Sequence, residues 1–399
     1  MLPLLIPIVH KCLHPIKYIK MRPLLLLPLL FVPSWAVDPT NCATSNKQLT
    51  PSDFLLETQP DNPNVASLSA IFAAQNKKLT ISQLLEDVNH RLTTDSSGHK
   101  VWEDTPSFSD QDTTKWMPQG ISSSADALDV GTYQGKNAWV VSWHREDDKS
   151  VRVTFVDRGN GDRYRHALLV YPHAADDFRE VPIHAGGIVW YGDILFVVDT
   201  SKGIRAFDLT NVWQVGTTGE GVGKDGSGGY TAAGYKYVIP QIRWFKWTPT
   251  SFPFRFSFIA LDRTTTPDSL VVGEYQPNTT APVRFVRWPL DYTTRKLKAG
   301  PDGKTTQASW AYCVGIERMQ GTVSANGKFY ISRSNGKNSA GDLFGWTPGS
   351  LAYNNAGFYP RGPEDLSFDK RNGGRIYTVT EYPGARYIID KPVSSVRFS

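Results

Sequence analysis

The chain has 399 residues, with 43 lysines and arginines against 38 aspartates and glutamates, and aromatic residues make up 12% of it. This content of apolar and aromatic side chains excludes an intrinsically disordered protein, because their burial can offset the entropy lost on ordering the backbone. Glycine and proline number 33 and 27 and follow no fixed period, which excludes collagen-like and low-complexity chains.

The N-terminal residues carry the one long apolar stretch. Lys17, Lys20 and Arg22 precede the run at 24–32, and Ala36 follows it as a small residue suited to cleavage. This order predicts a secretory signal peptide over residues 1–36. The run is shorter than the roughly 20 residues that cross a bilayer, so an internal anchor is the less favoured alternative. Translation starting at Met21 rather than Met1 is also left open.

Removal of residues 1–36 changes the charge balance. It takes away four basic residues and no acidic one, which leaves 39 basic and 38 acidic side chains. The basic character therefore belongs to the targeting segment. Because nucleic-acid binding needs a concentrated basic face, we expect no nucleic-acid partner. We also expect a monomer that does not associate with membranes.

Two cysteines, Cys42 and Cys313, remain after residue 36. In an oxidising compartment an isolated pair predicts one disulfide, with two buried thiols as the alternative. Asn278-Thr279-Thr280 is a glycosylation acceptor in a proline-flanked loop. These features predict a secreted, extracellular glycoprotein.

Two regions follow the signal peptide. Residues 37–106 are predicted to form an N-terminal arm with short helices, because Ile81, Leu84, Leu85 and Val88 recur at helical spacing. Residues 107–399 consist of short runs rich in β-branched and aromatic residues, separated by glycine, proline, asparagine and aspartate. This second region is predicted to be all-β.

The β region repeats one hairpin. Pairs of apolar runs joined by a polar turn cover 138–156, 195–207, 270–287, 329–346 and 376–389. A repeat of some tens of residues predicts a β-propeller, with five blades as counted. A sixth blade is possible if 290–318 hides a degenerate copy. A strand at 395–398 is expected to close the ring against the first blade.

A segment with small residues precedes four of the five hairpins. These segments are 117–121, 182–187, 318–322 and 362–366, whereas 254–262 takes this place in the third repeat without the motif. They are predicted to be the innermost strands, where glycine lets neighbouring backbones approach closely.

The best-defined repeat runs from His184 to Leu209 and reads HAGGI…YG…LxVxDT…GxRxFDL. In this pattern the region from about 115 to 392 resembles secreted β-propeller proteins of filamentous fungi and actinomycetes. The resemblance implies a propeller fold and an extracellular location, and it implies no particular reaction.

In a four-stranded blade the innermost strand starts, and the second strand ends, at the same face. Polar residues from both places are therefore predicted to meet at one mouth of a central channel, where a ligand would bind. The candidate catalytic residues are His184 as a base, Glu364 as a less favoured base or an acid, and Arg318 to offset a substrate carboxylate. The candidate substrate-binding residues are Gln119, Gln320, Asp365, His144 and Arg333. Each also has a structural interpretation, as a latch between strands, a solvated acid or a surface ion pair.

The sequence contains no CxxC, no zinc-type His/Cys spacing and no glycine-rich nucleotide motif, so we expect no metal and no cofactor. The favoured hypothesis is a secreted carbohydrate-active protein that binds an extracellular glycan or another small ligand. If it is an enzyme, we favour a polysaccharide lyase acting on a uronate, in which His184 removes the proton α to the carboxylate and Arg318 or Arg333 offsets its charge. The alternative is a non-catalytic, lectin-like or protein-interaction propeller.

Overall fold

The computed structural model describes residues 42, 46–248 and 252–398. The predicted signal peptide at 1–36 lies outside the described residues. The prediction of a mainly β protein is confirmed. No helix in the described ranges is long and apolar enough to cross a membrane.

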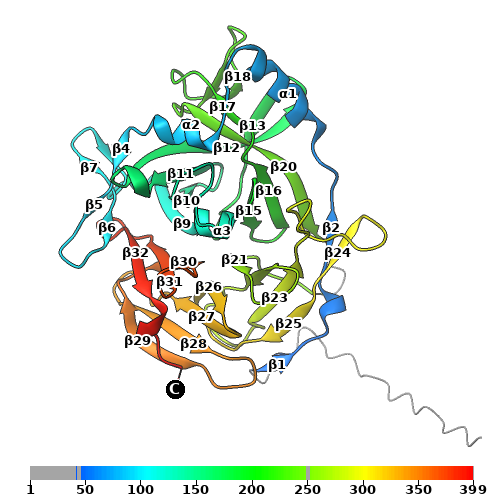
Figure 1. The fold of residues 1–399 in the computed structure, drawn as a ribbon, viewed down its shortest axis with the longest axis vertical. Coiled ribbons are helices and arrows are strands. Elements are labelled where there is room, and N and C mark those ends of the chain that lie inside the picture. Colours follow the sequence, from blue (N-terminus) through cyan, green and yellow to red (C-terminus); the bar gives the residue numbers. More distant parts are fainter. Residues whose placement is uncertain (1–41, 43–45, 249–251, 399) are drawn as a thin grey trace, which may run out of the picture. The chain divides into compact units, whose positions relative to one another are not determined.

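Most strands belong to five four-stranded antiparallel units, which we call sheets 1 to 5 (Figure 1). Sheet 1 contains β9 (Trp116–Ser123), β10 (Ala138–Arg145), β11 (Val151–Asp157) and β12 (Arg163–Ala174). Sheet 2 contains β14 (Ile188–Tyr191), β15 (Ile194–Asp199), β16 (Gly203–Asp208) and β20 (Tyr237–Trp247). Sheet 3 contains β21 (Phe258–Asp262), β22 (Ser269–Gly273), β23 (Arg284–Pro289) and β25 (Trp310–Cys313).

The last two sheets follow the same order. Sheet 4 contains β26 (Met319–Ala325), β27 (Lys328–Arg333), β28 (Gly341–Trp346) and β29 (Tyr353–Tyr359). Sheet 5 contains β30 (Pro363–Asp369), β31 (Arg375–Thr380), β32 (Tyr387–Pro392) and, from the N-terminal region, β6 (Lys100–Val101). Each of the five predicted hairpins is thus present as the second and third strands of a sheet. Parallel pairing of β12 with β20 also joins sheets 1 and 2.

The first strands of the sheets form a ring. β9 contacts β14, β14 contacts β21, β21 contacts β26, β26 contacts β30, and β30 contacts β9. In Figure 1 the later strands of each sheet lie further from the middle of the view. The second strands are buried along nearly their whole length, because sheets cover both of their faces. This two-sided burial explains why their sequences are continuous apolar runs.

Glycines allow the first strands to approach one another. A Cβ atom added to Gly187, just before β14, would lie 2.5 Å from the backbone nitrogen of Ile259 in β21. One added to Gly321 in β26 would lie 2.6 Å from Cα of Asp365 in β30. The small residues of the repeated segments are therefore explained by backbone contact between neighbouring sheets.

The N-terminal region lies along the outer edges of four sheets. β1 (Lys47–Gln48) pairs with β25, β2 (Leu55–Thr58) with β20 and β24 (Thr305–Gln307), and β4 (His90–Arg91) with β12. β5 (Thr93–Thr94) pairs with β6, which extends sheet 5. The predicted disulfide joins Cys42 to Cys313 in β25, with Cα atoms 5.6 Å apart.

The helices are short. α1 (Pro63–Ala74) and α2 (Ile81–Glu86) lie in the N-terminal region, and α3 (Ser124–Ala127) follows β9. α2 begins at a capping box formed by Thr80 and Gln83. Short 3₁₀ turns occupy Pro51–Asp53, Arg158–Asn160 and Val393–Ser395.

Small accessory strands complete the described chain. β3 (Lys78–Leu79) pairs with β17 (Val212–Gln214), β7 (Asp104–Thr105) with β8 (Phe108–Ser109), β13 (Asp177–Glu180) with β12, and β18 (Val222–Lys224) with β19 (Tyr230–Ala232).

The structure excludes one alternative for the predicted ring, and the expected closing strand at 395–398 is wrong. Residues 290–318 form no sixth sheet, because β24 and β25 complete existing sheets at their outer edges. Residues 395–398 form no strand with sheet 1. Instead, the backbone of Arg397 exchanges hydrogen bonds with the side chain of Asn355 in β29 of sheet 4, and β6 supplies the last strand of sheet 5.

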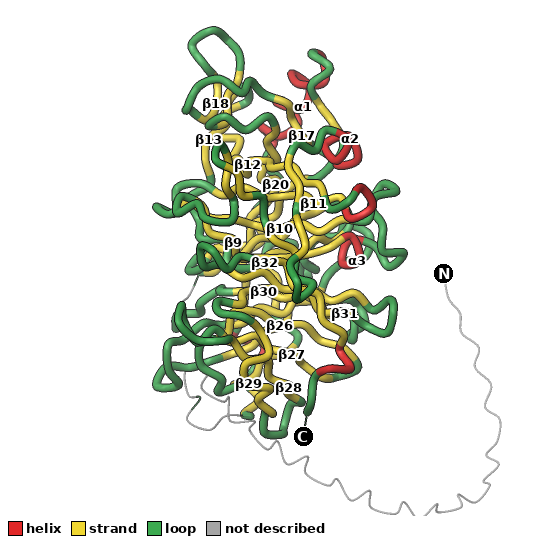
Figure 2. Tube along the Cα trace, turned by 90° about the vertical axis from the view of Figure 1, so that its left-hand side faces the viewer, coloured by secondary structure: helices red, strands yellow, loops and turns green. Residues whose placement is uncertain are grey.

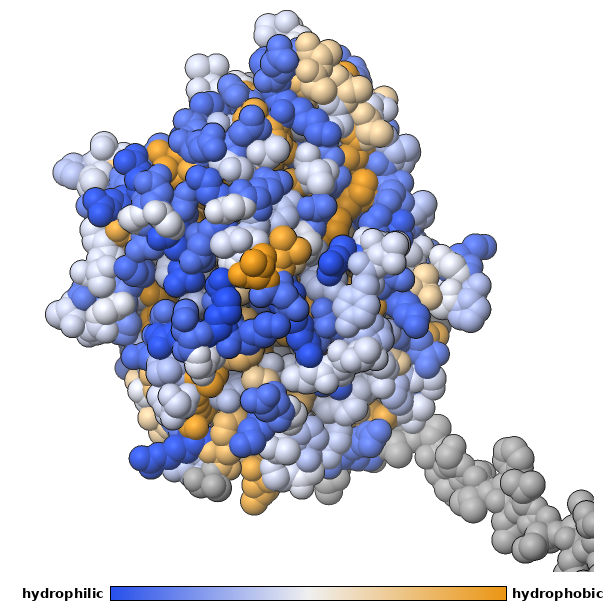
Figure 3. All heavy atoms as spheres, viewed as in Figure 1, coloured by the Kyte–Doolittle hydropathy of each residue, from blue (hydrophilic) through white to orange (hydrophobic). Residues whose placement is uncertain are grey.

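The two ends of the first strands open onto opposite faces. Figure 2 shows the strands between two layers of loops. α3, which follows the C-terminal end of β9, lies on the right-hand side of that view. The face seen in Figure 3 is largely hydrophilic, with small separate hydrophobic patches. The residues considered next lie at the N-terminal ends of the first strands.

Candidate functional site

A cavity of about 400 Å³ lies where the first strands start. Residues of the predicted first-strand segments line it, among them Gln119, His184 and Gln320. Three more, Thr200, Tyr275 and Glu381, follow the second strands of sheets 2, 3 and 5. The cavity thus gathers residues from all five sheets, because β9, β14, β21, β26 and β30 start at its edge.

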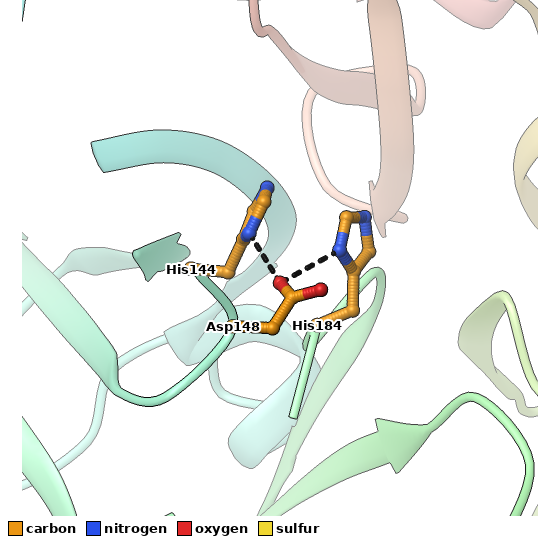
Figure 4. A group of neighbouring side chains, drawn as sticks. All are labelled: His144, Asp148 and His184. Carbon is orange, nitrogen blue, oxygen red and sulfur yellow. Dashed lines mark hydrogen bonds and ion pairs between the residues drawn. The ribbon is translucent and has the colours of Figure 1, made fainter. Parts of the chain in front are cut away.

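Two histidines converge on one carboxylate at the rim of this cavity (Figure 4). Asp148, in the turn between β10 and β11, places Oδ1 2.6 Å from Nδ1 of His144 and 3.1 Å from Nδ1 of His184. The two imidazole rings have centroids 4.0 Å apart. Asp148 and His184 line the cavity, whereas His144 is buried behind them. Burial, and then the neighbouring His184, lowers the pKa of His144 to about 4, so its imidazole is neutral at pH 7.

The two glutamines bridge neighbouring sheets through carboxylates. Nε2 of Gln119 donates to Glu381 over 3.3 Å, and Nε2 of Gln320 donates to Glu364 over 3.2 Å. The carboxyl groups of Glu364 and Glu381 also interact with each other. This chain of contacts links sheets 1, 5 and 4 along one side of the cavity. Gln119 and Gln320 therefore hold neighbouring sheets together, and both also line the cavity.

Glu364 lies below the surface of the cavity. Its side chain is 1% exposed. Burial, together with the charges of Glu381 and Asp365, raises its pKa well above the usual value for a carboxyl group. A raised pKa favours the protonated form of Glu364, which suits a proton donor and not a base.

Asp365 occupies the interior of the ring and not the cavity wall. It is fully buried, and Oδ2 accepts a hydrogen bond from the backbone N–H of Ile188 in β14 over 3.0 Å. β30 and β14 are not neighbours in the ring, so this side chain reaches across its middle. Burial raises the pKa of Asp365 well above its usual value. The position indicates a latch that fills the ring beneath the cavity.

The two predicted arginines lie away from the cavity wall. Arg318 pairs with Glu317, with Nη2 and Oε1 2.8 Å apart. Arg333 pairs with Asp342, and its guanidinium lies 4.8 Å from the ring centroid of Phe344. The cation that faces the cavity is instead Arg255, which precedes β21.

Arg255 is exposed, and its guanidinium carbon lies 5.5 Å from the ring centroid of Tyr275. Its backbone N–H donates to Oε1 of Glu274, so the main chain here is fixed while the side chain extends into the cavity region. Within the described ranges the guanidinium forms no ion pair. An arginine without a carboxylate partner at a polar cavity is suited to binding an anion.

Sequence reasoning missed Asp148, Arg255 and Tyr275. Asp148 follows His144 by four residues in a turn that contains three acidic residues in a row, so no pattern set it apart. Arg255 lies in the third first-strand segment, which lacks the repeated motif, and position alone could have identified it. Tyr275 could have been found in the same way, because it follows a second strand as Thr200 and Glu381 do.

Asn278 lies exposed in the loop between β22 and β23, and Oδ1 accepts a hydrogen bond from the backbone N–H of Thr280. A loop position of this kind is open to a glycan. No protein-family model matches the chain, and no curated protein is significantly similar to it. The interpretation of the site therefore rests on its geometry.

Proposed function

We propose that the protein is a secreted five-bladed β-propeller that binds an acidic saccharide in the cavity lined by Gln119, His184, Arg255 and Gln320. Five four-stranded antiparallel sheets with a ring of first strands support the propeller. The Cys42–Cys313 disulfide, the sequence order at residues 1–36 and the exposed Asn278 support secretion and glycosylation.

The chemistry of the cavity supports a saccharide. Amide groups of Gln119 and Gln320 offer both donors and acceptors, the hydroxyl groups of Thr200 and Ser257 add more, and the ring of Tyr275 provides a flat apolar face. A volume of about 400 Å³ lies within the usual range for small-ligand sites. The single observation that carries the proposal is that the guanidinium of Arg255 forms no ion pair with any described residue, which favours a ligand bearing a carboxylate.

A screen of immobilised oligosaccharides, with uronate-containing and neutral members, tests this proposal. We expect binding to uronates, and we expect Arg255→Met to weaken it about tenfold to a hundredfold, because a charge-assisted hydrogen bond is lost. Arg179→Met is the matched control, since Arg179 is also exposed and lies 5.4 Å from the ring of Tyr171 but outside the cavity. Binding that is equal in both variants would contradict the proposal.

A catalytic form of the same proposal is β-elimination from a bound uronate. In this reaction a base takes the proton α to the carboxylate, a C=C bond forms, and the glycosidic C–O bond breaks as its oxygen accepts a proton. His184 is the candidate base, with Nδ1 oriented by Asp148, and Glu364, whose pKa is raised, is the candidate proton donor.

Unsaturated products that absorb in the ultraviolet would report this elimination. We expect His184→Ala to abolish them and His173→Ala, in an exposed His–Asp pair elsewhere, to leave them unchanged. The non-catalytic, lectin-like function is supported by the latching bonds of Gln119 and Gln320. Binding of uronates without any such products would favour it.

A further inference from the structure

We propose that His144, Asp148 and His184 form a binding site for a borderline divalent transition-metal ion such as Zn²⁺, open to the cavity. Nothing in the binding function proposed above requires this ion. The proposal starts from three side chains brought together by two segments that are distant in the sequence, the β10–β11 hairpin and the residues before β14.

The arrangement differs from that of the other histidine–carboxylate pairs. These pairs, His90 with Glu103, His99 with Asp95, His166 with Asp110 and His173 with Asp177, each bring one imidazole to one carboxylate. At Asp148 two imidazole nitrogens approach the same oxygen atom, at 2.6 and 3.1 Å (Figure 4). Two donor nitrogens and one carboxylate oxygen facing a common point form a ligand set suited to a metal ion.

The distances are close to those a metal needs. Zn²⁺ binds imidazole nitrogen and carboxylate oxygen at about 2.0–2.2 Å, so ligand atoms of a tetrahedral site lie about 3.3 Å apart. The three donor atoms all lie within 4.8 Å of one another, and two of the separations are already 2.6 and 3.1 Å. Asp148 is about half exposed in a hairpin turn, so its carboxylate can move outward to admit the ion.

His144 holds the inner side of the site. Its Nδ1 also lies 2.9 Å from the carbonyl oxygen of Arg145. Ligation through Nδ1 therefore requires the ring to give up this hydrogen bond and to carry its proton on Nε2 instead. The imidazole of His144 is buried, so the surrounding side chains hold its Nδ1 in place. His184 and Asp148 line the cavity, so the remaining coordination positions face the space where the ligand would bind.

The donor set selects the class of ion. Imidazole nitrogen favours Zn²⁺, Cu²⁺ and Ni²⁺, whereas Mg²⁺ and Ca²⁺ prefer sites built from oxygen alone. Three protein ligands with an open position are typical of metal sites that bind a further ligand. A bound ion would prevent His184 from acting as the base. Glu381 would then remain as the candidate proton acceptor in the cavity wall.

Isothermal titration of the untagged, metal-free full chain with Zn²⁺ alone tests the site. We expect one saturable site for Zn²⁺, no comparable heat with Mg²⁺, and loss of affinity by at least about tenfold in His184→Ala and in Asp148→Ala. His173→Ala is the matched control, because His173 forms an exposed pair with Asp177 without a second imidazole. The paramagnetic resonance spectrum of bound Cu²⁺ should show nitrogen ligands that disappear in His184→Ala.

Absence of saturable Zn²⁺ binding, or equal affinity in wild type, His184→Ala and Asp148→Ala, would overturn the proposal. Both substituted side chains are partly exposed, so thermal unfolding of the variants should match wild type and exclude misfolding as the cause. Saccharide binding is measured separately by the oligosaccharide screen. Binding of Zn²⁺ without binding of any saccharide would therefore support the metal site and contradict the proposed function. Binding of saccharide without Zn²⁺ would contradict the metal site and support the proposed function.

Discussion

Replacement of Gly187 by alanine is expected to destabilise the ring of first strands. An added Cβ atom would lie 2.5 Å from the backbone nitrogen of Ile259, 2.7 Å from Cα of Phe258 and 3.0 Å from the carbonyl carbon of Phe258. Ordinary van der Waals contact begins at 3.4 Å, so β21 would have to move by about 0.9 Å. All three contacts are with backbone, which no rotamer change can relieve.

The expected cost follows from the packing of β21. This strand also contacts β26, and all five of its residues are buried, so a displacement is passed on to the next sheet. Overpacking of a close-packed interior costs about 1–3 kcal/mol, and we expect the upper part of this range because the clash is with backbone. Urea unfolding followed by tryptophan fluorescence measures the change in the free energy of unfolding.

Gly226→Ala is the matched control for this prediction. Gly226 has no atom within 4 Å of an added Cβ and lies in an exposed loop, so its replacement should leave the free energy of unfolding nearly unchanged. Equal stability of Gly187→Ala and Gly226→Ala would refute the reasoning, since it would mean that sheets 2 and 3 do not meet at Gly187 as described.

Two further predictions concern buried carboxyl groups. Asp110 is 1% exposed and accepts hydrogen bonds from Arg152, Tyr164 and His166 at 2.6–2.9 Å. Asp110→Ala should cost about 3–5 kcal/mol, because it leaves the buried Arg152 guanidinium without a carboxylate partner. A loss of stability in chemical denaturation no larger than that from replacing an exposed aspartate would contradict this. Glu364 has a raised pKa in the folded protein, so its contribution to stability is present below the unfolded pKa and is lost as the pH rises. The stability of Glu364→Gln relative to wild type should therefore increase as the pH rises from 5 to 8. A difference in unfolding temperature that stays constant over this range would contradict the raised pKa of Glu364.

The repeat was predictable because burial leaves a direct trace in the sequence. Strands such as β10 and β15 are covered on both faces, so they read as continuous apolar runs between polar turns. The small residues before β14 and in β26 likewise reflect backbone contact at Gly187 and Gly321. The ends of the ring were predicted less well. β6 pairs with β32 over only two residues, and residues 395–398 are held by the side chain of Asn355, and neither contact leaves a pattern in the sequence.

The site was predictable by position but not by role. The rule that first strands start where second strands end drew attention to Gln119, His184 and Gln320, which line one cavity. The same rule could not separate Arg333, whose guanidinium pairs with Asp342, from a cation free to bind a ligand. Such partners are set by side chains of neighbouring strands, which become known only from the three-dimensional arrangement.

The most direct test of the central claim compares two forms of one oligosaccharide, the free uronate and its methyl ester, binding to wild type and to Arg255→Met by titration calorimetry. The cavity and the guanidinium of Arg255 predict that wild type binds the uronate about tenfold or more tightly than the ester, and that Arg255→Met binds both forms equally. The same preference for the uronate in both proteins, or binding of neither form to wild type, would contradict the claim that this cavity recognises an acidic saccharide.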